Sequence, residues 1–340
     1  MAYICPVKAM RKGVRGPHSL RPMLTVVLLL LTCHCVPPTT QAQAPDSTDT
    51  IRIDSDLVNL NVSVLSKTPA QGVAPLQQKE FAVFENGTSQ EISFFASSEA
   101  PFDLVLLLDL SGSTANKIDL IRKSSKRFVD AARPGDRIAI VTFAAELQIV
   151  SPLSLDRKLL NRSIDEIEKP GGGTNFWDAL RFVLEHILGQ SRAENRRSAV
   201  VVMTDGVDNA LPDVFGEGSK TGFDELIEII RRSDSIVLPI YLDTEKEAVR
   251  NHQAPASAYV LARQQLDQIA AESGNLVYKA RKLKDLQNVY EQVMRDLSTM
   301  YSIGYRPADR TRDGSWRAVT IRLLGHPELV ARAKRGYYSK

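Results

Sequence analysis

The feature that most constrains this chain is an apolar run that ends in a cluster of side-chain oxygens. Phe102 and Leu104–Leu108 form the run, and Asp109-Leu-Ser-Gly-Ser113 follows it directly. Such a run predicts a strand that is buried on both faces, as in a parallel α/β sheet. Residues just past the carboxyl end of such a strand lie where open α/β sheets bind their ligands. The sequence therefore places one carboxylate and two hydroxyls at a ligand-binding edge.

One carboxylate and two hydroxyls suit a hard divalent cation. Mg²⁺ fits because it keeps several waters and takes few protein carboxylates. Two other segments offer oxygen atoms: Gly171-Gly-Gly-Thr174 precedes a helix expected at 175–188, and the buried-strand pattern Val200–Thr204 ends in Asp205-Gly206. Taken singly, each segment also fits an ordinary helix cap, loop or turn. Together at the carboxyl edge of one sheet, they predict a metal site.

Three segments resemble the parts of the metal-ion-dependent adhesion site of von Willebrand factor type A domains. They are Leu108-Asp-Leu-Ser-Gly-Ser-Thr114, Gly172-Gly-Thr174 and Thr204-Asp-Gly206, and the resemblance covers roughly residues 102–300. The resemblance implies that Ser111 and Ser113 bind the metal directly and that Thr174 binds it directly or through water. It implies that Asp109 and Asp205 act through waters or hydrogen bonds.

The resemblance also implies a partner, because protein ligands of this family usually complete the metal shell with their own carboxylate. Only Asp109 and Asp205 among the predicted site residues are carboxylates, which leaves a divalent cation under-neutralised. An incoming Asp or Glu would then gain charge-assisted attraction. We therefore expect a protein ligand that presents Asp or Glu, with Mg²⁺ as the ion and Mn²⁺ or Ca²⁺ as alternatives.

Residues 1–44 are typical of a secretory signal peptide. Basic residues without an acid precede the apolar run Met23–Leu31, and Ala42-Gln-Ala44 marks the expected cleavage point. All 3 cysteines lie upstream of it, so the mature chain would hold no disulfide. Cleavage removes five basic residues and changes the formal net charge from +3 to −2, so we expect no nucleic-acid partner. We expect a secreted, periplasmic or extracellular protein without a stable membrane span; an uncleaved anchor is the alternative.

We expect the rest of the chain to divide into a β-rich segment at 45–100, a domain at 101–300 that resembles von Willebrand factor type A domains, and β strands at 301–340 that pair with the first segment. Within the middle part, helices expected at 114–132, 156–168, 175–188, 223–232, 259–272 and 283–299 alternate with strands. This alternation predicts a doubly wound, mostly parallel sheet. We expect 243–257 to be a polar surface loop near the edge of the site.

The flanking segments carry strand patterns. We expect a strand from residue 57, a hairpin that joins Phe81–Phe84 to Gln90–Phe95, and strands at 301–305, 316–324 and 329–333. Each flank alone is too small to be stable, so we predict that they pair into one small β-sandwich-like domain. Gly304-Tyr-Arg-Pro307 and Arg335-Gly-Tyr-Tyr338 resemble a narrower group, the bacterial secreted proteins with a VWFA-related domain, in which strands flank the domain in this way.

Common enzyme classes lack their signatures here. Ser111 stands where a haloacid-dehalogenase-like phosphatase needs a second Asp, and the loop Gly171–Asn175 lacks the Lys of a phosphate-binding P-loop. With no Gly-x-Ser-x-Gly elbow either, we predict that the protein is not an enzyme. The sequence favours a secreted, metal-dependent binding or adhesion module. The alternatives are a structural subunit of a cell-envelope assembly whose metal site is empty or purely stabilising, and a hydrolase with unfamiliar groups.

Overall fold

The structure is a computed structural model that describes residues 57–68, 73–96, 100–114, 117–168, 171–189, 196–280 and 285–339. All of them belong to one unit of the chain, Asp54–Lys340. The predicted signal peptide at 1–44 lies outside the described residues. Within the described ranges, no helix is both long enough and apolar enough to cross a bilayer.

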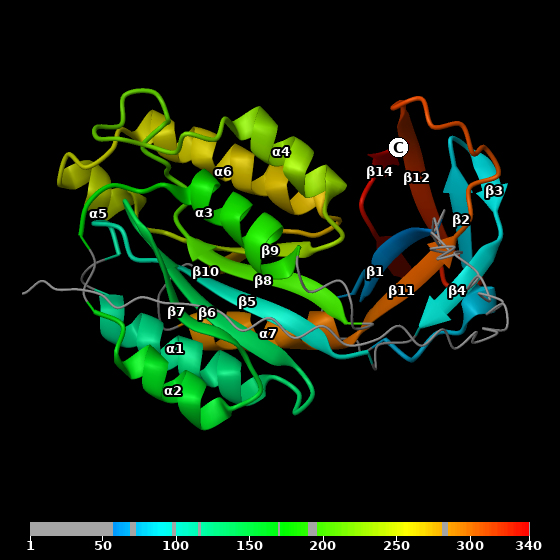
Figure 1. Cartoon of the computed structure of the whole chain (residues 1–340), viewed down its shortest axis with the longest axis horizontal. Helices are drawn as coiled ribbons and strands as arrows, with labels where there is room; N and C mark the ends of the chain where they lie inside the picture. The colour runs from blue at the N-terminus through cyan, green and yellow to red at the C-terminus, as the bar shows by residue number, and fades with distance from the viewer. Residues whose placement is uncertain are drawn as a thin grey trace, which may run out of the picture. The chain divides into compact units, whose positions relative to one another are not determined.

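A six-stranded sheet forms the centre of the domain that carries the predicted site (Figure 1). Its strand order is β10-β9-β8-β5-β6-β7, and every neighbouring pair is parallel except β6 and β7. The strands are β5 Phe102–Asp109, β6 Arg137–Phe143, β7 Leu147–Ser154, β8 Arg197–Thr204, β9 Ile236–Leu242 and β10 Tyr278–Ala280. The mostly parallel sheet predicted from the sequence is confirmed.

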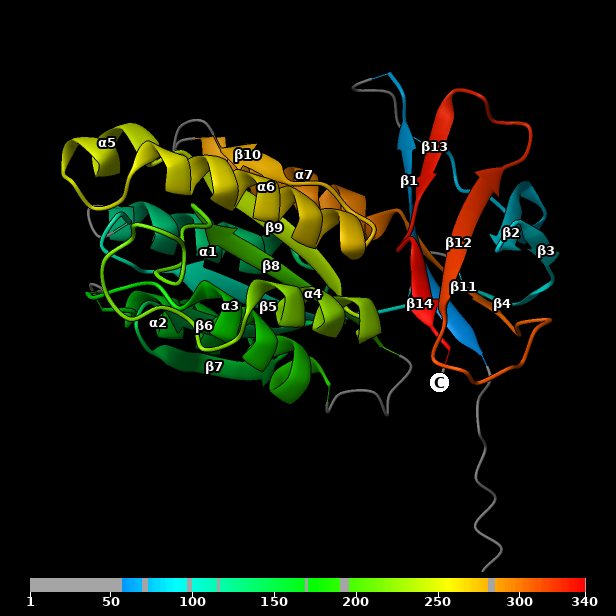
Figure 2. The same ribbon diagram turned by 90° about the horizontal axis from the view of Figure 1, so that it is seen from above.

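Helices cover both faces of this sheet (Figures 1 and 2). One layer holds α1 Ile118–Ala131, α2 Arg157–Asp165 and α7 Leu286–Ser298, and the other holds α3 Phe176–Phe182, α4 Phe223–Arg232 and α6 Ala256–Glu272. All eight residues of β5 are buried. Leu104, Leu106 and Leu108 pack under the first layer, whereas Val105 and Leu107 pack under the second. Burial on two faces explains why the strand is apolar without alternation.

Several predicted elements differ in detail. The helix expected from Thr114 begins at Ile118, and the helix expected through Leu188 changes to a π-helical stretch at Val183–Leu188. The segment expected as a polar loop, 243–257, contains the helix α5 Glu245–Arg250. Only Ala248 of this helix is buried. A single buried side chain leaves too weak an apolar period for a helix to be predicted.

The flanking segments pair with each other in two four-stranded sheets, β13-β1-β11-β4 and β14-β12-β2-β3. Their strands are β1 Val58–Ser66, β2 Phe81–Glu85, β3 Thr88–Gln90, β4 Ile92–Ala96, β11 Met300–Tyr305, β12 Trp316–Leu323, β13 Leu329–Arg332 and β14 Gly336–Tyr338. Antiparallel pairing joins β1 to β11 and β2 to β12, so each sheet contains strands from both ends of the described chain. Leu60, Val83 and Ile303 lie in a separate apolar core. Strands from the two flanks therefore share both sheets.

The predicted hairpin is only half correct. β2 turns through Asn86 and Gly87, whose φ angles are 47° and 83°, and pairs with β3. The chain then leaves that sheet, and β4 pairs with β11 in the other one. The second half of the expected hairpin thus joins a strand from the opposite end of the described chain, a pairing that local sequence patterns do not encode.

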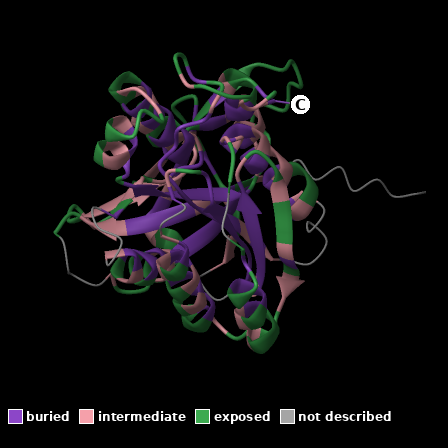
Figure 3. Ribbon diagram, turned by 90° about the vertical axis from the view of Figure 1, so that its left-hand side faces the viewer, coloured by how far each residue is buried: buried purple, intermediate pink, exposed green. Residues whose placement is uncertain are grey.

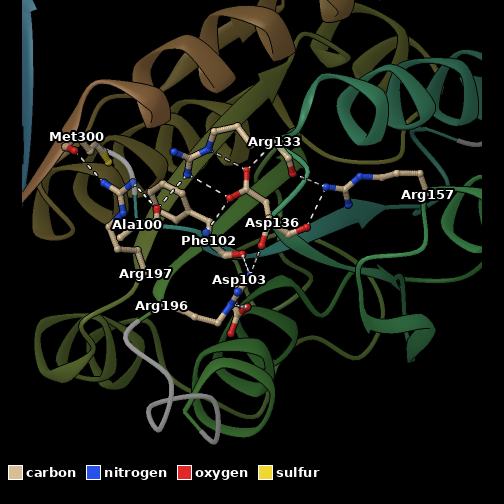
Figure 4. Close-up of polar contacts among 10 residues, drawn as sticks. Ala100, Phe102, Asp103, Arg133, Asp136, Arg157, Arg196, Arg197 and Met300 are labelled. Atoms are coloured by element: carbon tan, nitrogen blue, oxygen red, sulfur yellow. Dashed lines mark hydrogen bonds and ion pairs between the residues drawn. The ribbon is translucent and has the colours of Figure 1, made fainter. Parts of the chain in front are cut away.

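A network of arginines and aspartates lies at the amino ends of the parallel strands (Figure 4). Asp103 of β5 is fully buried. Arg137 donates to both of its carboxylate oxygens at 2.8 Å, and Arg196 donates to Oδ1 at 2.6 Å. This bidentate and charge-assisted pairing stabilises a carboxylate that the apolar strand would otherwise leave unpaired.

The same network holds the chain where it enters and leaves the α/β domain (Figure 4). Arg197 donates to the carbonyl of Ala100 at 2.7 Å and to the carbonyl of Met300 at 2.8 Å. Its guanidinium lies 4.1 Å from the centre of the Phe102 ring. Burial lowers the pKa of Arg197 to about 10, with a further contribution from the charge of Arg133. Arg197 remains charged at neutral pH and fixes β11 beside the start of β5.

Candidate metal-binding site

The predicted site residues lie where the parallel strands end. Asp109 is the last residue of β5, and Asp205 directly follows β8, which is paired in parallel with β5. Ser111 and Ser113 lie between β5 and α1, and Thr174 lies just before α3. Neighbouring parallel strands bring their carboxyl ends to one edge, so residues almost a hundred positions apart become neighbours.

Hydrogen bonds join four of the predicted side chains. The Ser113 hydroxyl donates to Oδ2 of Asp205 at 2.7 Å, and the hydroxyl oxygens of Ser111 and Ser113 are 3.2 Å apart. Oδ1 of Asp109 accepts from the backbone N–H of Ser111 at 2.9 Å, and its Oδ2 accepts from the Thr204 hydroxyl at 2.6 Å. Both oxygens of Asp109 are thus occupied by protein donors, whereas the serine hydroxyls face each other.

A cavity of about 350 Å³ opens at this edge and is lined by Ser111, Ser113, Thr174 and Asp205. Asp109 is fully buried and does not line it. The structure therefore brings all five predicted residues to one place, with four on the cavity wall and Asp109 behind them. Asp109 therefore contacts the site through its hydrogen bonds to the Ser111 N–H and the Thr204 hydroxyl.

The electrostatics of this edge favour a cation. Burial raises the pKa of Asp109, and the nearby charge of Asp205 raises it further. Two carboxylates close together in a buried place are costly unless positive charge lies beside them. Lys117 lies close by, since its Nζ donates to the carbonyl of Ser113 at 3.1 Å, but its ammonium group forms an ion pair with Glu247 at 3.5 Å. A divalent cation would supply the positive charge that the two carboxylates need.

The chemistry of the donor set fits such an ion. Every predicted donor is an oxygen atom, and three of the five side chains are neutral hydroxyls. Hard cations such as Mg²⁺ select oxygen donors and retain waters where the protein offers few charges. Within the described residues, no group of three or more His, Cys, Asp or Glu side chains could hold a metal ion, so a metal at this edge would rely on hydroxyls.

Several residues that support the site were not predicted. Thr244, after β9, donates its hydroxyl to Oδ2 of Asp205 at 2.6 Å. The side-chain Oδ1 of Asn209 accepts from the backbone N–H of Thr174 at 3.0 Å, and the backbone N–H of Asn209 donates to the Thr174 carbonyl at 2.9 Å. These contacts depend on segments that meet only in the folded protein. In the sequence, only the polar character of Asn209 and Thr244 indicated that they could support the site.

Gly206 is required by the backbone directly after Asp205. Its φ is 79°, in the left-handed region, and a Cβ there would lie 2.7 Å from Cδ1 of Leu266. Both restrictions exclude a side chain. Gly206 therefore lets α6 pack closely against the turn that presents Asp205.

One family model matches the α/β part of the chain. The model of the von Willebrand factor type A domain matches residues 103–292, which is more than half of the chain. An uncharacterized protein of Borreliella burgdorferi is 29% identical over 117 residues, which are 32% of this chain and 33% of that protein. The chain thus spans about a third of the length of this curated relative.

Among solved structures, the vWF domain of the type V pili tip protein Mfa5 from Porphyromonas gingivalis is 15% identical, with a TM-score of 0.38 and coverage of 59% of this chain and 95% of that one. BatB from Bacteroides thetaiotaomicron is 14% identical, with a TM-score of 0.42 and coverage of 58% and 98%. Proximal thread matrix protein 1 from the mussel byssus, with a zinc-occupied MIDAS motif, is 15% identical, with a TM-score of 0.39. That match covers 59% of this chain and 48% of the mussel chain.

The family match, the mostly parallel sheet and the three motifs at its carboxyl edge point to the same conclusion. Von Willebrand factor type A domains are a family of adhesion and protein-binding modules. Because its family model covers most of the α/β part, this protein belongs to the von Willebrand factor type A domain family.

Proposed function

We propose that this protein is a secreted binding module that holds a divalent cation and captures a protein partner through a carboxylate of that partner. Ser111, Ser113 and Thr174 would bind the ion, and Asp109 and Asp205 would hold it through waters and hydrogen bonds. Mg²⁺ is the proposed ion, with Mn²⁺ and Ca²⁺ as alternatives. An Asp or Glu of the partner would complete the shell. No catalytic step forms part of this proposal.

The observation that carries the proposal is the convergence of Ser111, Ser113 and Asp205 on one cavity. The Ser113 hydroxyl lies 2.7 Å from the Asp205 carboxylate and 3.2 Å from the Ser111 hydroxyl. All three residues, with Thr174, line a cavity of about 350 Å³. A cavity with a cation at its base and room above it is suited to a single incoming carboxylate.

A structural role in a cell-envelope assembly is the second candidate, and it predicts a different result. In that case the metal would contribute only to folding, and partner capture would not depend on it. The experiment below separates the two candidates because it measures capture with and without the ion.

The test uses an array of random twelve-residue peptides and the full protein with its signal segment removed. The Mg²⁺ concentration is about 5 mM, which exceeds a dissociation constant on the order of a millimolar, as expected of a weak cation site. Under this condition we expect retained peptides to be enriched in Asp and Glu. EDTA should abolish the enrichment, and Ser113→Ala should reduce it at least about tenfold because one direct ligand is lost. Equal retention with Mg²⁺ and with EDTA would contradict the adhesion role and favour the structural one.

A further inference from the structure

An exposed aromatic side chain stands at the rim of the metal-site cavity. Phe215 is 85% exposed, and it is the most exposed large hydrophobic residue of the described chain. It lines the same cavity as Ser111, Ser113 and Asp205. An aromatic ring in water gives up a large apolar area when a partner covers it, and such residues dominate the energy of many interfaces.

The loop that presents Phe215 is fixed from beneath. Asn209 donates its side-chain N–H to the carbonyl of Phe215 at 2.7 Å, and the same side chain accepts from the backbone of Thr174 at 3.0 Å. Gly216, with a φ of 105°, allows this approach, because a Cβ there would lie 2.5 Å from Nδ2 of Asn209. The Asn209 side chain therefore links the backbone of Phe215 to the backbone of Thr174, a predicted metal-site residue.

A second anchor holds the base of the loop. Asp208 is fully buried, and its carboxylate accepts from the N–H of Trp177 at 3.0 Å and from the hydroxyl of Ser219 at 2.6 Å. It also accepts from the N–H of Ala210 at 2.8 Å. Asp208 thus binds the base of the loop to α3 and joins the two ends of the loop. A side chain that is presented on a fixed loop loses little entropy when it is covered.

The size of the cavity limits what can enter. His252, Gln253 and Ala254, which follow α5, line the cavity together with Val214 and Phe215. A cavity of about 350 Å³ has room for a side chain of a partner. A partner that places a carboxylate on the metal brings its neighbouring residues to the rim, where Phe215 stands.

We infer that Phe215 is a specificity-determining residue, which selects partners whose Asp or Glu lies within two residues of a large apolar or aromatic side chain. This inference rests on the proposed function, because the carboxylate is positioned by the metal. The occupant is a segment of a protein partner that is acidic at one position and apolar beside it. The cation attracts the acid, and Phe215 covers the apolar neighbour.

The test uses peptides with one central Glu, in which each of the two positions on either side is Ser, Lys, Leu or Phe. With Mg²⁺, the wild-type protein should retain peptides with Leu or Phe beside the Glu about tenfold better than peptides with Ser, the range expected of an aromatic contact. Phe215→Ser should lose this preference, and Phe215→Leu should keep most of it. Phe94→Ser is the matched control, since Phe94 is 44% exposed on β4 and does not line this cavity.

Titration of each variant with Mn²⁺ separates a contact with the partner from damage to the site. Loss of the apolar preference with unchanged Mn²⁺ affinity supports the inference. An unchanged preference in Phe215→Ser overturns the inference and leaves the proposed function standing. A loss of preference that is accompanied by weaker Mn²⁺ binding has the same two consequences. If the wild-type protein shows no metal-dependent retention of Glu peptides, the proposed function itself fails, and this inference fails with it.

Discussion

Asp109→Ala is expected to abolish the stabilisation of the protein by Mg²⁺. A ligand that binds only the folded state adds about 2.7 kcal/mol when its concentration is a hundredfold above its dissociation constant. Asp109 accepts from Ser111 and Thr204, and so orients the turn that carries both serine hydroxyls. Without it, the hydroxyls lose their common orientation. Thermal unfolding in Mg²⁺ and in EDTA should give the same midpoint for the variant and clearly different midpoints for the wild type.

Asp119→Ala is the matched control for this measurement. Asp119 lies in α1, close in sequence to the site, and its side chain is 93% exposed. Its removal should leave the Mg²⁺-dependent shift intact, since a surface ion pair contributes roughly 0–1 kcal/mol. An Mg²⁺ shift of the wild-type size in Asp109→Ala would show that the ion binds elsewhere.

Asp103→Ala is expected to lower the free energy of unfolding by about 3–5 kcal/mol, the usual cost of removing one partner from a buried ion pair. The carboxylate of Asp103 is fully buried and accepts from both Arg137 and Arg196 (Figure 4). Its loss leaves two guanidinium groups, 26% and 13% exposed, without their carboxylate. Denaturant unfolding measured in EDTA isolates this effect from metal binding.

The control for Asp103→Ala is Asp165→Ala. Asp165 pairs with Lys126 at 2.5 Å, but its side chain is 60% exposed. Because solvent screens an exposed pair, we expect a loss below about 1 kcal/mol. Equal losses in the two variants would mean that the buried network at the amino ends of the strands adds nothing beyond surface pairing.

The α/β part could be predicted from sequence because its core is two-sided. Leu104–Leu108 pack alternately under two helical layers, which forces an unbroken apolar run that a local pattern reveals. The outward faces of the surrounding helices are exposed, as the view from the side on which α5 lies shows (Figure 3). Amphipathic helices between buried strands therefore give a periodic signal over most of this part.

The elements that were mispredicted depend on contacts between distant segments. β4 leaves its neighbour β3 to pair with β11, and nothing in Ile92–Ala96 specifies that partner. Asp103 interrupts an apolar strand, and its two arginine partners lie 34 and 93 residues away. A carboxylate in a strand core is unfavourable by local rules, and only the folded arrangement explains it.

For the candidate site, sequence motifs predicted which residues meet but not how they are supported. Asp109, Ser111 and Ser113 follow one strand, so their proximity is local. The distant Asp205 joins them because β5 and β8 are parallel neighbours. By contrast, the hydroxyl of Thr244 and the side chain of Asn209 carry no motif, yet they fix Asp205 and Thr174. Their role depends on the folded positions of two loops at the sheet edge, because Thr244 follows β9 and Asn209 follows β8.

Buffer-matched calorimetric titration of the metal-free protein with Mn²⁺ tests most directly whether these five side chains form one cation site. We expect one ion bound per chain, competition by Mg²⁺, and loss of binding in the double variant Ser111→Ala/Ser113→Ala, whose fold is checked by its far-UV circular dichroism. A folded double variant that binds Mn²⁺ with wild-type affinity would contradict the proposal of a single cation site. A wild-type chain that binds no Mn²⁺ would also contradict it.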